Sequence, residues 1–574
     1  MRTTNDAQRQ SPLMLLHPMK VAVAHTLLRS RLRRTDAERA QPRSTPHMKD
    51  QLRDPLISFT MDTKLFRILR PALALLTGMG GLASHTHAQP SAPVTTVEVD
   101  LAKTTGPLDH IWKGAGSDRA AITLREDWRK DLSRFHDEAG LQWVRFHGIF
   151  NDELDVFAPS IQTQGKEPNW QNVDRVYDGI LARGVRPIVE LSFMPKRLAS
   201  GKQTFGFYQG NITPPKDFEA YGSFIKSFVE HLVDRYGSEE VRQWFFEVWN
   251  EPNLFFFWSG KMEDYFKMYE AAATAVKSVD PAIMVGGPAT SKMEWLPEFL
   301  AYCETNAVPL DFIGTHAYVG DDQEKLFGHK DAYPFSEVLP AAMRIAREQI
   351  DSTAFKGVPL YLTEWASDSP AMIAHIIKGC LGNVQLMSHW TVSNTYEELG
   401  VAEWVLKEGS NGYGMIAAAG IPKPQFNTYK LLHRLGHSRL AASNGPVLAS
   451  RRDDGTAAIT VWNLTEVRQP GGIPGSAPTR DVIGEHGPKK IRVVLKGMRP
   501  GQTVMVSYVD QERGSPYPEW RRIGSPQYPT MAQIEAIRKS AELAPPETLK
   551  LGSNGDLVLD LPPECLALIE TDRP

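Results

Sequence analysis

The sequence predicts an α/β protein, a closed (β/α)8 barrel of the TIM type followed by an accessory C-terminal antiparallel β-sandwich. From about residue 95 to 435, short apolar segments alternate with longer amphipathic segments, the pattern of repeated βα units. Eight such units in ~330 residues favour a closed barrel. Beyond residue 440, alternating segments follow one another with turn residues between them. An open doubly wound sheet is the alternative, but no Gly-x-Gly-x-x-Gly motif opens a helix.

Length and composition place the chain among folded globular proteins. Its 574 residues are too many for one simple core, so one large and one smaller domain are expected. The 42% of hydrophobic and 23% of charged residues are ordinary for a soluble globular protein. A net charge of −3 gives no electrostatic reason to expect a nucleic acid or an anionic membrane as a partner.

Three cysteines, Cys303, Cys380 and Cys565, are too few for a disulfide framework and lack zinc-ligand spacing. One pair could form a bridge, but the sequence gives no reason to expect it. We therefore expect neither a metal nor an organic cofactor.

The N-terminus differs from the rest of the chain. Residues 1–60 are Arg-rich without a sustained period and are interpreted as a disordered leader or an over-extended start. Residues 61–88 combine a basic start, a short apolar run at 71–83 and small residues before Gln89, the pattern of a secretory signal. The apolar run is too short to span a membrane. A periplasmic or secreted protein is therefore expected; the alternative is a cytoplasmic protein with an apolar N-terminal helix.

The barrel domain is expected at 89–435. Residues 94–101 alternate with a period of two and predict a strand, which could instead pair with the sandwich. A helix over 126–138 is closed by Gly140, a common C-terminal stop. The eight barrel strands are expected at 110–113, 142–146, 185–191, 244–248, 283–286, 312–314, 360–362 and 384–387.

The second domain is expected at 436–574. Its strands alternate with a period of two and are separated by Gly, Pro and Asp, and one amphipathic helix near 531–543 interrupts them. The clearest of these strands are 457–462, 490–495, 503–508 and 556–561.

Two carboxylates stand where a barrel enzyme places its reactive groups, at the carboxyl ends of strands. The fourth strand is stopped by Pro252, which cannot continue a ladder, so Glu251 is expected at the strand tip. The seventh strand leads directly to Glu364. An acid and a nucleophile on opposite sides of a barrel mouth are what glycoside hydrolysis requires. The alternative for Glu364 is a buried ion-pair partner.

Other strand ends supply polar and aromatic side chains. The second strand leads to His147, the sixth to His316 and Tyr318, and the eighth to Trp390. A histidine at a strand end is often structural, and a large ring can serve both core and site. Three aromatic residues are candidates for the rim that the sequence does not separate from packing residues: Phe207, Tyr208 and Trp258.

The segments Trp249-Asn-Glu-Pro-Asn253 and Leu362-Thr-Glu-Trp365 resemble the motifs of clan A retaining glycoside hydrolases. Within that clan the chain resembles family 39, the β-xylosidase and α-L-iduronidase group, over roughly residues 95 to 565. The resemblance implies that Glu251 is the general acid/base and Glu364 the nucleophile. Further segments share it: Val144-Arg-Phe-His-Gly148, Gly210–Asp217, Gly314-Thr-His-Ala-Tyr318 and His389–Glu398.

The remaining roles follow the same resemblance. Tyr318 is similar to the tyrosine that orients the nucleophile, and His147 and His316 to ligands of sugar hydroxyls. Asn250 is expected to hydrogen-bond the sugar 2-OH. Trp390 would form the floor of the −1 subsite. Glu397, or its neighbour Glu398, would bind outer hydroxyls; the alternative is a solvated turn.

The substrate is expected to be neutral. The iduronidase pattern has a lysine two residues after the sixth-strand histidine, and here that position is Tyr318. Glu397 would also repel a sugar carboxylate. We therefore expect exo-hydrolysis of β-1,4-xylosides, as xylo-oligosaccharides, from the non-reducing end by double displacement. Two alternatives stay open: a clan A glycosidase acting on glucosides, arabinosides or an exopolysaccharide, and a non-catalytic carbohydrate-binding protein. The sequence does not indicate the oligomeric state.

Overall fold

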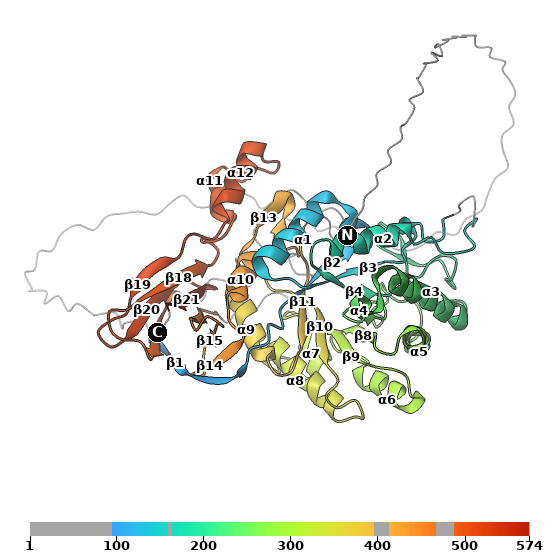
Figure 1. The fold of residues 1–574 in the computed structure, drawn as a ribbon, viewed down its shortest axis with the longest axis horizontal. Coiled ribbons are helices and arrows are strands. Elements are labelled where there is room, and N and C mark those ends of the chain that lie inside the picture. Colours follow the sequence, from blue (N-terminus) through green and yellow to red (C-terminus); the bar gives the residue numbers. More distant parts are fainter. Residues whose placement is uncertain (1–93, 159–163, 395–412, 466–486, 573–574) are drawn as a thin grey trace, which may run out of the picture. The chain divides into compact units, whose positions relative to one another are not determined.

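A computed structural model describes residues 94–158, 164–394, 413–465 and 487–572 (Figure 1). The predicted fold class is confirmed, because these residues form a closed eight-stranded barrel and a separate nine-stranded sheet. The expected leader at 1–60 and the signal segment at 61–88 lie outside the described residues. No helix among the described residues has the length and apolar character needed to cross a bilayer.

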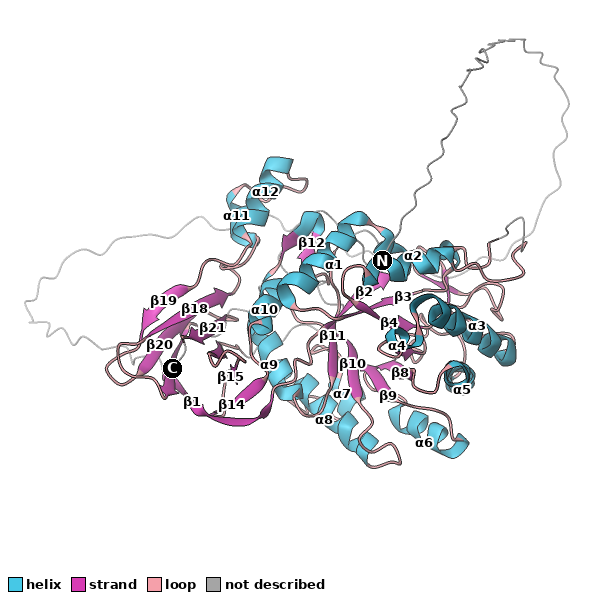
Figure 2. Cartoon of the chain, viewed as in Figure 1, coloured by secondary structure: helices cyan, strands magenta, loops and turns pink. Residues whose placement is uncertain are grey.

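The barrel strands are all parallel, and the helices lie outside them (Figure 2). Their order around the barrel follows the chain, which places the carboxyl ends of all eight strands at one mouth. In that order the strands are β2 (Gly114–Arg119), β3 (Trp143–His147), β4 (Arg186–Glu190), β7 (Phe245–Glu247), β8 (Met284–Ser291), β9 (Phe312–His316), β10 (Leu360–Trp365) and β11 (Leu386–His389).

The predicted position of the first barrel strand is wrong. It was expected at 110–113, whereas β2 begins at Gly114 and consists of small and polar residues that are all buried. The physical reason is close packing, because a Cβ atom at Gly116 would lie 2.1 Å from the ring of Trp390. Apolar Ile111 and Trp112 instead pack in the core before the strand.

The helices begin and end at recognisable signals. Helix α1 (Glu126–Ala139) ends at Gly140, whose φ of 73° is left-handed, as predicted. Helix α3 (Phe218–Tyr236) begins at Asp217, whose carboxylate accepts hydrogen bonds from two backbone N–H groups of the first turn. The other helices of the barrel are α2 (Gln171–Leu181), α4 (Ser238–Val241), α5 (Met262–Val279), α6 (Leu296–Asn306), α7 (Gln323–Phe327), α8 (Val338–Asp351), α9 (Pro370–Cys380) and α10 (Pro424–His433). Two short hairpins complete it: β5 (Thr204–Phe205) with β6 (Gly210–Asn211), and β12 (Ile416–Ala417) with β13 (Ile421–Pro422).

The second sheet contains the first strand of the described chain. Strand β1 (Val94–Pro107) pairs antiparallel with β14 (Ser438–Ala442) and parallel with β17 (Lys489–Lys496). Val97 and Val99 of β1 are fully buried in a core of the sheet's own side chains. The other strands pair antiparallel and are β15 (Val447–Arg451), β16 (Ala457–Trp462), β18 (Thr503–Val509), β19 (Glu547–Lys550), β20 (Asp556–Leu561) and β21 (Leu566–Thr571). Helices α11 (Tyr517–Arg522) and α12 (Met531–Ser540) lie between β18 and β19 in the sequence.

Candidate active site

Glu251 was predicted at the tip of a strand stopped by Pro252, but β7 already ends at Glu247, and Glu251 lies in the segment that follows it. That segment places Glu251 at the barrel mouth. The backbone N–H of Glu251 donates to the carbonyl of Ala289, just before β8 ends, at 2.9 Å. Trp249 and Glu251 have positive φ values of 72° and 41°, an unfavourable conformation for residues other than glycine. The indole N–H of Trp249 donates to the carbonyl of Phe257 at 2.9 Å and fixes this turn. Backbone strain of this kind persists only where the surrounding structure holds the residue in place, and it is common at active sites.

Glu251 and Glu364 lie close together. One oxygen from each carboxylate and one nitrogen of His316 are all within 4.8 Å of one another. Carboxyl groups of retaining glycosidases are about 5–5.5 Å apart, whereas inverting enzymes need about 6.5–9.5 Å to admit a water. The spacing therefore suits direct attack by one carboxylate. The same three residues could in principle hold a divalent cation, and the expectation of a metal-free site stays a prediction.

Hydrogen bonds hold Glu364 in one orientation. The hydroxyl of Tyr318 donates to Oε1 of Glu364. Nη1 of Arg145 lies 3.4 Å from Oε2 of Glu364. Burial, together with the charge of Glu364, raises the pKa of Tyr318 well above its ordinary value, so its phenol stays protonated and remains a donor. These contacts favour an ionised Glu364.

His316 lies between the two carboxylates. Its Nδ1 is 3.1 Å from Oε1 of Glu251 and 3.5 Å from Oε2 of Glu364. Burial lowers the pKa of His316 to about 4, although the charge of Glu364 acts in the opposite direction. The imidazole is therefore neutral at neutral pH and does not replace Glu251 as the acid.

A buried arginine that the sequence analysis did not identify lies beneath the pair. Arg145 in β3 is fully buried, with Nε 2.5 Å from Glu247 Oε2 and Nη2 3.0 Å from Glu190 Oε2. Burial by itself would lower its pKa, but Glu247, Glu190 and Glu364 raise the pKa above the ordinary value. Three ionisable residues, Arg145, Glu190 and Glu247, lie inside strands that are otherwise apolar in sequence. Ionisable residues are almost never buried unless they are paired, so this pattern was the available signal for the cluster.

Arg145 also organises the sugar-binding candidates. Its Nη2 donates to Oδ1 of Asn250 at 2.9 Å, so Asn250 can offer its amide N–H groups to a sugar hydroxyl. Glu190 orients His147 through a 2.7 Å contact between Oε2 and Nδ1. Burial alone would raise the pKa of Glu190, but His147 and Arg145 outweigh it and hold the pKa below its usual range.

The structure brings Trp390 to the site but leaves Glu397 undescribed. The Trp390 ring is 1% exposed and its centroid lies 4.9 Å from that of His147. Its role as the floor of a sugar subsite stays a prediction, because so deeply buried a ring also packs the core. Glu397 and Glu398 lie outside the described residues.

Replacing Arg145 with methionine is expected to lower the free energy of unfolding by about 3–5 kcal/mol, because three buried carboxylates lose their shared cation. Denaturant unfolding followed by circular dichroism measures this effect. As a control, Arg522→Ala removes a surface cation whose side chain is 69% exposed and should leave the midpoint unchanged. A midpoint for Arg145→Met equal to that of the control would contradict the assigned role.

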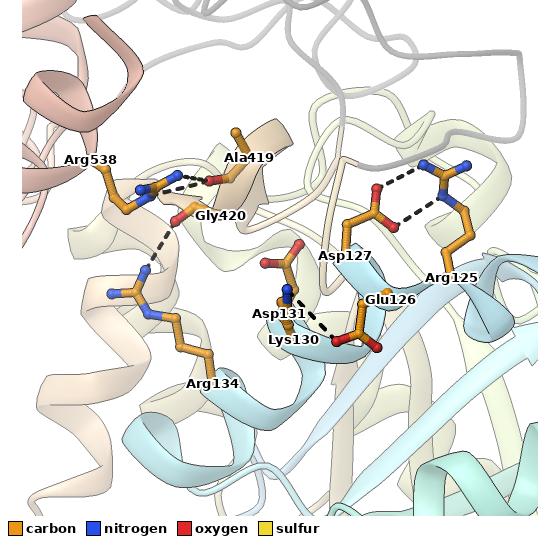
Figure 3. Close-up of a pocket in the computed structure, with 9 residues that line it drawn as sticks. All are labelled: Arg125, Glu126, Asp127, Lys130, Asp131, Arg134, Ala419, Gly420 and Arg538. Carbon is orange, nitrogen blue, oxygen red and sulfur yellow. Dashed lines mark hydrogen bonds and ion pairs between the residues drawn. The ribbon is translucent and has the colours of Figure 1, made fainter. Parts of the chain in front are cut away.

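A cavity of about 850 Å³ lies elsewhere and is not the candidate active site (Figure 3). It is lined by residues of α1, by the turn at Ala419–Gly420 and by Arg538 of α12. Arg134 and Arg538 donate to the carbonyls of that turn. Burial raises the pKa of Asp131 in its wall to about 7, while Ser393 donates to Oδ2 at 2.5 Å and lowers it. The cavity contains neither Glu251 nor Glu364.

Comparison with known proteins gives matches over most of the chain. The model of glycosyl hydrolases family 39 matches residues 95–548. A β-xylosidase from Caldicellulosiruptor saccharolyticus is 35% identical over 499 residues, covering 82% of this chain and 96% of the relative. A β-xylosidase from Geobacillus stearothermophilus is 32% identical over 450 residues, covering 74% and 85%. The crystal structure of a monomeric β-xylosidase from Caulobacter crescentus CB15 is 32% identical, with a TM-score of 0.73 and coverage of 83% of this chain and 99% of that one.

Proposed function

The chain belongs to glycosyl hydrolase family 39, and from that premise we propose that it is a retaining, exo-acting β-xylosidase. Its substrates would be β-1,4-xylosides, as xylo-oligosaccharides, cleaved at the non-reducing end by double displacement. The observation that supports this proposal most strongly is the spacing of Glu251 and Glu364, since one oxygen of each carboxylate lies within 4.8 Å of the other. The relatives that are at least 32% identical to this chain and are named above are β-xylosidases.

In the first step Glu364 attacks the anomeric carbon and forms a glycosyl ester, while Glu251 gives its proton to the leaving oxygen. In the second step the Glu251 carboxylate takes a proton from water, and the oxygen of that water displaces Glu364. Each displacement inverts the anomeric centre, so the product retains the β configuration. Glu251 ends the cycle protonated and Glu364 ionised, as they began.

The contacts around the pair suit these steps. Tyr318 and Arg145 both hold Glu364 before it attacks, since they donate to different oxygens of its carboxylate. Asn250, whose amide oxygen accepts a hydrogen bond from Arg145, would donate from its amide nitrogen to the sugar 2-OH, a contact that strengthens in the transition state.

The charges of the site favour a neutral sugar over a uronic acid. Tyr318 occupies the position at which the iduronidase pattern has a lysine, and its hydroxyl donates a hydrogen bond to Glu364. Arg145 is shared by Glu190, Glu247 and Glu364 and so has little positive potential to offer a substrate carboxylate. Because the site has little positive charge for a substrate carboxylate, and because the relatives named above are β-xylosidases, we infer that the substrate is a xyloside.

Export to the periplasm or the exterior is part of the proposal and is supported by the signal-like pattern at 61–88. N-terminal sequencing of the protein purified from the periplasm or the medium tests it, with Gln89 as the expected first residue. Retention of residues 61–88 in the mature protein would contradict export by this route.

A panel of p-nitrophenyl glycosides tests the function. The kcat/KM for the β-xyloside is expected to exceed that for the β-glucoside and the α-arabinoside by about tenfold or more, because an extra or different group in a shaped pocket costs on the order of 1–3 kcal/mol. Proton NMR during hydrolysis should show β-xylose before mutarotation. Dominant turnover of another sugar would favour a different clan A specificity, and absence of turnover would favour a binding protein.

A further inference from the structure

Three phenylalanines on two segments near the candidate active site are exposed. Phe207, Phe255 and Phe256 are 54%, 85% and 38% exposed. We call these three residues the aromatic rim. Aromatic side chains gathered on a surface cost hydration free energy, and they are typical of surfaces that bind a ligand or partner.

The rim is the outer end of a continuous series of rings that starts inside the site. His147 is fully buried, and its ring centroid lies 5.8 Å from that of Phe257, which is 3% exposed. The Phe257 ring lies 4.9 Å from that of Phe256, and the Phe256 ring 5.3 Å from that of Phe255. Exposure therefore rises step by step from the sugar-binding candidate outward.

Backbone hydrogen bonds connect the rim to the acid/base residue. The N–H of Leu254 donates to the carbonyl of Glu251 at 2.9 Å, and the N–H of Phe257 donates to the carbonyl of Leu254 at the same distance. Phe255 and Phe256 thus lie on the turn that begins at Glu251. Because Glu251 protonates the leaving oxygen, this turn flanks the leaving-group side of the scissile bond.

A second segment supports the turn from below. The Phe205 ring lies 4.4 Å from that of Phe257 and 6.0 Å from that of Phe256. The N–H of Ser259 donates to the carbonyl of Ile212 at 2.9 Å and ties the turn to the β5–β6 hairpin region. The rim is therefore held in place by packing and by main-chain bonds.

Phe207 is held by a cation. The guanidinium of Arg119 lies 4.9 Å from the centre of the Phe207 ring and 4.8 Å from that of Tyr208. Arg119 is itself fixed by ion pairs with Asp118 at 2.7 Å and Glu153 at 2.9 Å. An exposed ring held in this way presents a face to solvent without collapsing onto the protein.

We propose that Phe255 and Phe256 form a platform that binds the leaving-group xylose units of an oligosaccharide or xylan chain. This inference rests on the proposed function. Equatorial hydroxyls leave the faces of a β-xylosyl ring lined by C–H groups, which stack on an aromatic face, and xylose has no hydroxymethyl group to hinder the approach. The rings continue outward from His147 along the turn that begins at Glu251, so a sugar chain leaving the pocket on that side meets them first.

The test compares two substrates of Phe255→Ala. Xylotetraose reaches the platform, whereas β-xylosyl fluoride has a leaving group of one atom and does not. The ratio of kcat/KM for xylotetraose to that for the fluoride is expected to fall about fivefold, the scale of one aromatic stacking contact. Met531→Ala, at another exposed apolar residue (77% exposed, in α12), is the control and should leave the ratio at the wild-type value.

The outcomes separate the two proposals. If the wild type hydrolyses both substrates and Phe255→Ala has the same ratio of kcat/KM for xylotetraose to that for the fluoride, the platform is wrong and the proposed function stands. Loss of a wild-type dimer in Phe255→Ala by sedimentation, again with an unchanged ratio, would assign the rim to a second copy of the chain and overturn it as well. Failure of the wild type to hydrolyse either xyloside would overturn the proposed function and the platform with it. Phe255→Trp keeps an aromatic ring at this position and should therefore have the wild-type ratio of the two kcat/KM values. If replacing Phe255 simply unfolded the protein, the tryptophan variant would not recover that ratio.

Discussion

Replacing Glu364 with alanine is expected to lower kcat for xylosides by roughly 10⁵-fold or more, the scale of removing an enzymatic nucleophile. The carboxylate supplies the atom that bonds to the anomeric carbon. Tyr318 and Arg145, which hold it, are a neutral donor and a cation and so are not nucleophiles. Steady-state hydrolysis of p-nitrophenyl β-xyloside measures the loss.

Azide distinguishes loss of the nucleophile from loss of folding. In Glu364→Ala a small anion can enter the space left by the carboxylate and attack the anomeric carbon from that face. The expected product is the α-xylosyl azide, with one inversion. Glu337→Ala is the matched control, because this carboxylate pairs with His375 near the surface and is 44% exposed; its kcat should stay within about twofold of wild type. Near-normal activity of Glu364→Ala would show that the nucleophile is another residue.

Replacing Glu251 with alanine is expected to have an effect that depends on the leaving group. Hydrolysis of xylobiose should fall by roughly 10⁴-fold, because a sugar alkoxide cannot leave without a proton. A 2,4-dinitrophenyl xyloside needs no proton in the first step, so its glycosyl ester should form at a rate near that of wild type. The comparison of the two substrates by burst and steady-state kinetics measures this difference.

Azide again reports the role, now with the opposite stereochemistry. In Glu251→Ala the glycosyl ester on Glu364 forms and waits, because no base activates water. Azide attacks without a base and completes a second inversion, giving the β-xylosyl azide. An α product, or equal losses for xylobiose and the dinitrophenyl xyloside, would contradict the assignment of Glu251 as acid/base.

The barrel and the carboxylate pair could be predicted because they depend on local signals. Gly140 ends a helix, and the period of the apolar residues separates strands from helices. These features need no knowledge of distant contacts. Pro252 is not such a signal, because the strand before it already ends at Glu247. The proximity of Glu251 and Glu364 agrees with the rule that the carboxyl ends of barrel strands meet at one mouth; their catalytic roles stay predictions.

The position of the first barrel strand could not be predicted, because the strand must contain a small residue where an aromatic ring from a distant part of the sequence packs against it. Gly116 in β2 leaves the space that the ring of Trp390 occupies, more than 270 positions later in the chain. Neither Gly116 nor Trp390 belongs to a run of apolar residues from which β2 could have been recognised in the sequence.

Arg145 was missed for a similar reason. A charged residue within Val144-Arg-Phe146 looks unfavourable until Glu190 and Glu247 are placed beside it from two other strands. The exposure of aromatic side chains also depends on how loops meet. Phe207 and Trp258 were equal candidates for the rim, yet Phe207 is 54% exposed and Trp258 only 2%, its indole N–H donating to the carbonyl of Lys261 at 3.0 Å.

In the proposed mechanism Glu364 forms a covalent bond with the sugar. Incubation with 2,4-dinitrophenyl 2-deoxy-2-fluoro-β-xyloside should trap this ester, because the fluorine slows both its formation and its hydrolysis, whereas the activated leaving group speeds its formation alone. Mass spectrometry of the digested protein is expected to find the fluoroxylosyl group on the peptide that contains Glu364. A label on Glu251, or an unlabelled protein that releases dinitrophenol continuously, would contradict a covalent intermediate on Glu364.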